Sequence, residues 1–195
     1  MNAQALWYLT RGSGIVSLIL LTLAVIAGIA TSTRWAKPRW PRFVTEGLHR
    51  NASLLSTVFV FVHIASAVLD GYVSIRWLDA IVPFGAAYKP LWLGLGALSL
   101  DAFLAIALTS MLRARLGYRT WRSVHWLAYG CWALALVHGL GAGSDRSQAW
   151  MLALDGLAVG SVLVASAWRT WPVVRGTLGR PGRLSPIEEM EGAFQ

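Results

Sequence analysis

Long apolar runs separated by short polar connections make up most of the chain. A helix needs about 20 mainly apolar residues to cross the hydrocarbon core of a bilayer. Five runs reach or approach this length, at residues 14–31, 49–69, 91–112, 124–140 and 150–168. The pattern predicts an all-α fold, an integral membrane helical bundle of five transmembrane helices, with six as the alternative count.

Basic residues in the connections predict how the bundle is oriented. Lys and Arg are frequent between residues 34 and 50, between 113 and 122, and again from 169 onward. The connections at 70–90 and 141–149 carry few of them, and Asp residues roughly balance those few. Because cytoplasmic loops have an excess of Lys and Arg, we expect a multi-pass protein of the plasma (inner) membrane. Its N-terminus would lie outside and its C-terminus in the cytoplasm.

The spans predict one domain followed by a short tail. Residues 1–168 are expected to form the transmembrane domain, and the first run is kept as a helix because it is longer than a typical signal-peptide core. Residues 169–195 are expected to form a mostly disordered cytoplasmic tail, since the sequence becomes polar and rich in Pro and Gly. Apolar residues at partly helical intervals between 71 and 89 predict a short helix at the outer interface.

Composition narrows the classes of function that fit. Hydrophobic residues make up 56% of the chain and charged residues only 13%, which indicates that lipid is the main solvent and partner. The net charge of +8 is then a topology signal, and no nucleic-acid partner is expected. The single cysteine, Cys131, excludes an intrachain disulfide and any multi-thiolate cluster. The spans leave no room for a nucleotide-binding domain, so an electron donor would be a separate molecule.

The four histidines of the chain fall in two pairs on the second and fourth predicted spans. Both spans run outward from the cytoplasm, and a rise of 1.5 Å per residue separates the two histidines of each span by about 20 Å. Imidazole is a common axial ligand of haem iron, and helical bundles build cofactor sites from facing helices. We therefore predict two bis-histidine haem b sites between these helices. His49 and His125 would bind the inner iron, and His63 and His138 the outer iron.

The interval between the two histidines differs between the second and the fourth predicted span. Fourteen residues separate His49 from His63 and return to within about 40° of the same helix face, whereas the thirteen from His125 to His138 miss it by about 140°. The fourth span is therefore expected to be distorted, for example near Gly130, or else the two haems approach it from different sides.

Other polar residues near these levels have candidate roles. Arg50 and Arg122 lie near the inner level and could pair with haem propionates, because guanidinium binds carboxylate through two hydrogen bonds. Asp101, near the middle of the third span, is expected to be a neutral acid bonded to a neighbouring helix or a partner of an axial imidazole. Zinc or copper is disfavoured, because the two levels are too far apart to share an ion and each offers only two imidazoles.

Two stretches of the sequence resemble a known family. They are LHRNASLLSTVFVFVHIASAVLD at 48–70 and RLGYRTWRSVHWLAYGCWALALVHGLGAGSD at 115–145. Both are similar to the ferric reductase-like transmembrane domain superfamily, which includes NADPH oxidases, ferric reductases, STEAP proteins and the bacterial haem subunit MsrQ. The second stretch looks closest to the MsrQ branch, whereas the dipeptide His49-Arg50 resembles the two-haem oxidases and ferric reductases.

The resemblance implies a component of an oxidoreductase, a dihaem membrane cytochrome b. Electrons would pass from a cytoplasmic reduced flavin donor to an acceptor on the outer face: ferric chelate, oxygen or a periplasmic or extracellular redox protein. Eukaryotic oxidases and ferric reductases carry a fused cytoplasmic flavin and nicotinamide domain that this chain is expected to lack, so a separate flavin reductase would supply FMN or FAD. One alternative is a quinol-linked subunit of an MsrQ-like system with one or two haems. From another class, a non-haem transporter or assembly factor would use the histidines structurally.

Overall fold

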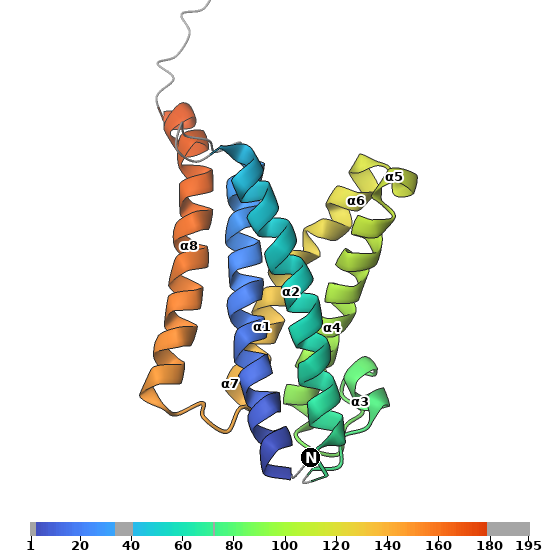
Figure 1. Cartoon of the computed structure of the whole chain (residues 1–195). Helices are drawn as coiled ribbons and strands as arrows, with labels where there is room; N and C mark the ends of the chain where they lie inside the picture. The colour runs from blue at the N-terminus through green and yellow to red at the C-terminus, as the bar shows by residue number, and fades with distance from the viewer. Residues whose placement is uncertain (1–2, 34–40, 72, 179–195) are drawn as a thin grey trace, which may run out of the picture.

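The structure is a computed structural model, and it describes residues 3–33, 41–71 and 73–178. Every regular element in this part of the chain is a helix (Figure 1). In chain order the elements are α1 (Ala3–Ser32), α2 (Arg42–Leu69), α3 (Trp77–Ile81), α4 (Pro90–Met111), α5 (Arg113–Leu116), α6 (Tyr118–His125), α7 (Leu127–Ala142) and α8 (Ala149–Leu178). The predicted all-α fold is confirmed.

Four helices of the described chain are long and apolar enough to cross a membrane, namely α1, α2, α4 and α8. They contain four of the five predicted spans, which confirms a multi-pass membrane protein. The remaining span, at 124–140, is divided between α6 and α7. The 16 residues of α7 cover about 24 Å, less than the roughly 30 Å of a bilayer core, so a fifth crossing stays a prediction.

Small residues bring α1 and α2 together along most of their length. Ala24 and Ala27 of α1 and Ala52 and Ser56 of α2 are all buried, and Ser56 is fully inaccessible. Short side chains allow helix backbones to approach closely in lipid, where apolar burial alone does not drive association. The first two spans therefore form one tight antiparallel pair.

A second pair consists of α4 and α7. Its centre holds two reciprocal bonds, in which the Ser99 hydroxyl donates to the Cys131 carbonyl at 2.9 Å and the Cys131 thiol donates to the Ser99 carbonyl at 3.3 Å. The two pairs are joined by contacts between α1 and α7, where Trp132 Nε1 donates to Thr22 Oγ1 at 3.0 Å. Beside this bond Leu18, Leu136 and Ala158 form a small core in which α8 also packs.

The short outer helix expected between 71 and 89 is α3. At its start the Arg76 main-chain amide donates to Asp79 Oδ2 at 2.9 Å and the Arg76 guanidinium donates to Oδ1 at 2.8 Å. Residue Lys89, at the start of α4, donates to the carbonyls of Gly141 and Ala142 at 3.3 Å. These last carbonyls of α7 have no partner within their own helix, so the ammonium group stabilises the helix end.

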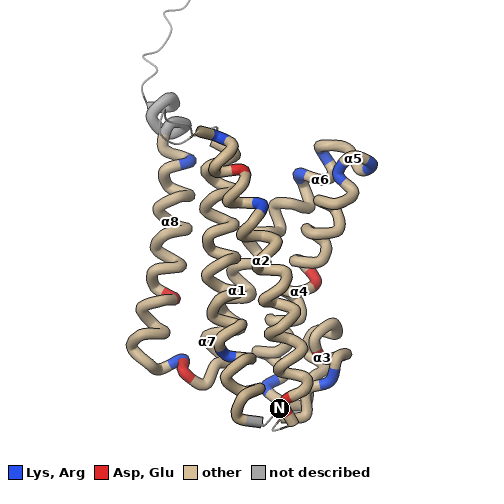
Figure 2. The backbone as a smooth tube through the Cα atoms, viewed as in Figure 1, with Lys and Arg blue, Asp and Glu red and all other residues tan. Residues whose placement is uncertain are grey.

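Charged residues gather at the two ends of the bundle (Figure 2). Basic side chains dominate the end that holds α5, α6 and the end of α8, and the other end mixes both signs. The predicted basic residues Arg34, Lys37 and Arg39 lie outside the described residues, as does 179–195 of the predicted tail. Residues 169–178, which were expected to begin the tail, continue α8.

Candidate functional site

The structure brings the four histidines together in the pairs that the sequence predicts. The ring centroids of His49 and His125 lie 6.0 Å apart with an interplanar angle of 74°, and those of His63 and His138 lie 6.3 Å apart at 83°. The first pair contains the last residue of α6, a helix at the basic end of the bundle (Figure 2). The second contains His63, which is bonded to Thr10 near the start of α1, at the end that holds α3 (Figure 1). Each pair takes one ring from α2 and one from the segment α6–α7.

A break in the fourth span explains how thirteen residues can separate two ligands that face the same helix. Helix α6 ends at His125 and α7 begins at Leu127, with Trp126 between them. At the break, the Tyr129 amide donates to the Trp126 carbonyl only three residues back, at 3.3 Å, which tightens the turn. The expected distortion therefore exists, but four residues before Gly130.

Three of the four imidazoles are fixed by main-chain carbonyls of a neighbouring helix. Nδ1 of His49, His63 and His138 lies 2.8 Å from a carbonyl oxygen, that of Ala24, Thr10 and Trp92 respectively. A carbonyl can only accept, so Nδ1 carries the proton and donates it. The lone pair of Nε2 is then free to bind a metal, as in metal sites where the second ring nitrogen donates to a carbonyl.

The fourth imidazole is held differently. Nδ1 of His125 is buried and has no hydrogen-bond partner among the described residues. Its ring instead stacks on Trp121, with centroids 4.9 Å apart and planes 29° apart. The Arg113 guanidinium covers the Trp121 ring at 4.2 Å from its centroid. The inner pair therefore has one ring fixed by a carbonyl and one fixed by stacking.

Ring spacing fits two axial ligands of one iron. A metal–imidazole bond of about 2 Å, with roughly 1 Å from that nitrogen to the ring centre, places two axial rings about 6 Å apart. Rings in direct edge-to-face contact have similar spacing, so the Nδ1 bonds that leave Nε2 free carry more weight than the distance. No group of three or more His, Cys, Asp or Glu exists in the described part of the chain. Two imidazoles suit a metal that brings its own equatorial ligands, as haem iron does.

Comparison with known proteins identifies the family. Residues 13–136 match the family described as ferric reductase like transmembrane component. This chain belongs to the ferric reductase-like transmembrane family. The match covers well over half of the chain, and makes it a transmembrane redox component. No curated protein and no solved structure matched it.

Three histidines of this ferric reductase-like chain, His49, His63 and His125, lie inside the matched range, and His138 lies two residues beyond it. The pairing of His138 with His63 therefore rests on the structure. Sequence reasoning missed the carbonyl partners and Trp121. The stacked ring stands four residues before His125, a spacing that places side chains on one helix face.

The predicted propionate partners lie at the inner end. Arg50 is exposed on α2, one residue after an inner histidine. The Arg122 guanidinium is exposed too, and Nη1 donates to the Tyr118 hydroxyl at 2.6 Å. Asp101 is partly exposed on α4, and the acceptors for Nδ1 of His49, His63 and His138 are carbonyls rather than this acid.

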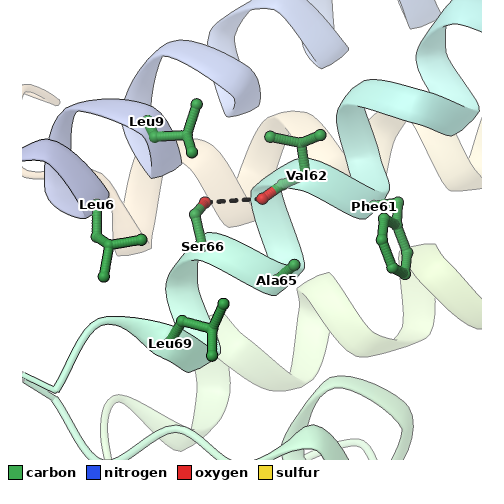
Figure 3. Close-up of a pocket in the computed structure, with 7 residues that line it drawn as sticks. All are labelled: Leu6, Leu9, Phe61, Val62, Ala65, Ser66 and Leu69. Carbon is green, nitrogen blue, oxygen red and sulfur yellow. Dashed lines mark hydrogen bonds between the residues drawn. The ribbon is translucent and has the colours of Figure 1, made fainter. Parts of the chain in front are cut away.

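A shallow pocket opens between α1 and α2 near the outer pair (Figure 3). Six of its seven lining residues are apolar, and the seventh is Ser66. The Ser66 hydroxyl donates to the Val62 carbonyl at 2.7 Å and accepts from Thr10 Oγ1 at 2.9 Å. Since its hydroxyl is already bonded, the pocket offers an apolar surface suited to lipid.

Proposed function

We propose that this chain is a dihaem membrane cytochrome b that relays electrons from a cytoplasmic reduced flavin donor to an acceptor on the outer face. The acceptor would be a ferric chelate, oxygen or a redox protein. One observation carries the proposal: two histidine pairs at two depths, with three of the four rings held so that Nε2 is free.

Four histidines and two arginines would hold the two haems. His49 and His125 would bind the inner haem iron, and His63 and His138 the outer one. Haem b, when bound, supplies an iron that accepts and releases one electron. Two imidazoles on each iron would leave no open position for oxygen, which would favour electron transfer over oxygen binding. Arg50 and Arg122 are placed to attract carboxylates at the inner level.

The charge distribution supports a direction of transfer. Basic residues dominate the end of the bundle near His49 and His125, and such an excess is typical of the cytoplasmic side. A reduced flavin carries phosphate groups, and guanidinium groups pair well with phosphate. A separate flavin reductase that presents FMN or FAD would therefore meet a complementary surface at this end.

Haem content and its dependence on the histidines test the proposal. Purified wild-type protein should contain two haems per chain and show a reducible low-spin spectrum. His49→Ala and His138→Ala should each lose one haem, whereas Gln148→Ala, in the connection before α8, should lose none. A colourless wild-type preparation contradicts the function. Unchanged haem content in His49→Ala would mean that a single haem is bound.

The donor is tested with protein in vesicles of defined orientation. Flavin reductase with a nicotinamide and free flavin, added on the basic side, should reduce both haems. A quinol in the bilayer should reduce them far more slowly. Faster reduction by the quinol than by the flavin reductase would show that the donor is a quinol and not a flavin.

A further inference from the structure

The three carbonyls that hold imidazoles have one feature in common: each stands four residues before a glycine. The carbonyls of Thr10 and Ala24 on α1 precede Gly14 and Gly28, and that of Trp92 on α4 precedes Gly96. The three glycines lie on two different helices and serve both histidine pairs. The same local arrangement therefore occurs three times in one chain.

Helix geometry explains why a glycine is needed at this position. Side chains in an α-helix tilt toward its N-terminus, so the side chain of residue i+4 lies over the carbonyl of residue i. That carbonyl already accepts the helical bond from the amide of residue i+4, and its second lone pair stays available only if nothing covers it. Glycine has no Cβ and leaves the oxygen open to a ring from another helix.

Contacts at the three glycines agree with this explanation. A Cβ added to Gly14 would lie 2.9 Å from Nδ1 of His63, and one added to Gly96 would lie 2.7 Å from Nδ1 of His138. At Gly28 the nearest atom would be Cε1 of His49, at 3.3 Å. Each imidazole therefore lies directly on its glycine, and a methyl group would push the ring away from the carbonyl.

Other glycines of the described chain show that this contact is specific. A Cβ at Gly12, Gly130 or Gly139 would meet nothing within 4 Å. Gly94 and Gly141 face aromatic rings of Phe84 and Trp92 instead. Within the described residues, contact with an imidazole is confined to the three glycines four residues after a bonded carbonyl.

We propose that Gly14, Gly28 and Gly96 are positioning residues for the haem ligands, an inference that rests on the proposed function. Each exposes a carbonyl that fixes its histidine with the proton on Nδ1 and Nε2 directed at the iron. The bond also draws the Nδ1 proton toward the carbonyl, which makes Nε2 a stronger electron donor and stabilises the oxidised iron. The outer site has two such ligands, and the inner site has one.

Glycine-to-alanine variants test the assignment at each site separately. Gly96→Ala and Gly14→Ala should weaken haem binding at the outer site by roughly ten- to a hundredfold, the usual effect of losing a partner of a metal-bound histidine. The reduction potential of the outer haem should move upward, since its ligand donates less. Gly28→Ala should shift only the inner haem and by less, because its Cβ contact is the longest. Gly139→Ala, on the same helix as His138, is the matched control.

Two measurements keep this test apart from the test of function. Potentials are read in a His49→Ala background, where only the outer haem should remain, and thermal unfolding reports whether each variant is folded. If wild-type protein binds two haems and folded Gly96→Ala matches Gly139→Ala in haem affinity, spectrum and potential, the positioning role is wrong while the function stands. If Gly96→Ala does not fold, Gly28→Ala, with the milder contact, decides by the same readouts on the inner haem, measured in a His63→Ala background that should retain only that haem.

Discussion

The outer and inner histidine pairs have nearly the same ring spacing but different support. Both outer rings donate from Nδ1 to a main-chain carbonyl of the helix packed against their own helix. His63 of α2 donates to α1, and His138 of α7 donates to α4. At the inner pair only His49 has such a bond, and His125 stands at a helix break with its ring on Trp121. Both rings of the outer pair are thus held by main-chain bonds, whereas the position of one ring of the inner pair depends on the local conformation of α6.

Basic residues at the two ends of the bundle also differ in the groups that they contact. Near the outer pair, Arg11 pairs with Asp145, Arg76 pairs with Asp79, and Lys89 binds the last carbonyls of α7. Near the inner pair, Arg113 lies over Trp121 and Arg169 over Trp126, while Arg42 pairs with Glu46. A guanidinium over an aromatic ring keeps more of its N–H donors for an anionic partner than one paired with a carboxylate. The proposed donor would meet such a guanidinium at Arg113.

Removing one ligand from each site should have the largest effect and should separate the two sites. In His138→Ala the inner haem should still be reduced from the basic side, but electrons should not reach an outer acceptor. In His125→Ala the donor should fail to reduce the outer haem, although dithionite still does. Stopped-flow absorbance in vesicles measures both rates. Equal effects of the two variants on donor-driven reduction would contradict the assignment of the inner haem as the first to receive electrons and the outer haem as the second.

Loss of the stacked ring should affect the inner site alone. Trp121→Leu removes an aromatic contact worth about 1 kcal/mol, so the affinity of the inner haem should fall several-fold while the outer haem is unchanged. Haem titration in His63→Ala protein, which should retain only the inner haem, measures this. Trp150→Leu, an exposed tryptophan at the start of α8, is the control. An equal loss in the control would show that Trp121 has no special role.

The hydrogen bond between the two helix pairs should make a small contribution to the stability of the bundle. Trp132→Phe removes the donor to Thr22 Oγ1, and hydrogen bonds between helices in membranes contribute about 0.6 kcal/mol on average. Unfolding in a detergent mixture should show a loss of this order in Trp132→Phe and in Thr22→Val. The double variant should lose no more than either single one. Additive losses would mean that the two groups act independently.

Acidification should give the smallest effect, limited to α3 near the outer end. The Arg76 guanidinium and main-chain amide hold the pKa of Asp79 below its ordinary value. A depressed pKa means that the carboxylate stabilises the folded helix above its unfolded pKa of about 3.9. This contribution is lost as pH falls through the lower, folded value. The protection factors of the α3 amides, which are corrected for the intrinsic exchange rate at each pH, should therefore fall below about pH 4, and Asp79→Asn should remove that pH dependence. An unchanged fall in Asp79→Asn would assign it to another group.

Periodicity and hydropathy predicted the features that repeat along the chain. Runs of apolar residues gave the spans, and two histidines on each of two spans gave the pairing of His49 with His125 and of His63 with His138. The thirteen-residue interval predicted either a distortion in the fourth span or two haems on different sides of it, and the structure has the distortion. Its position at Trp126 could not be predicted, because no proline or glycine marks that residue.

The partners of the histidines could not be predicted either. They are main-chain carbonyls of Thr10, Ala24 and Trp92, and every residue has a carbonyl, so side-chain type carries no signal. The sequence marks these carbonyls only by the glycine four residues later. That glycine can be interpreted only when the histidine-bearing helix packed against it is known. For Trp121 a signal existed in its i, i+4 spacing from His125.

Electron paramagnetic resonance of the oxidised protein tests the central claim most directly, because each bis-histidine iron gives its own low-spin ferric signal. We expect two low-spin signals of equal intensity, with one lost in His49→Ala and the other lost in His138→Ala. A single signal, a high-spin signal at either site, or two signals that survive both substitutions would contradict two histidine-ligated haems at two depths.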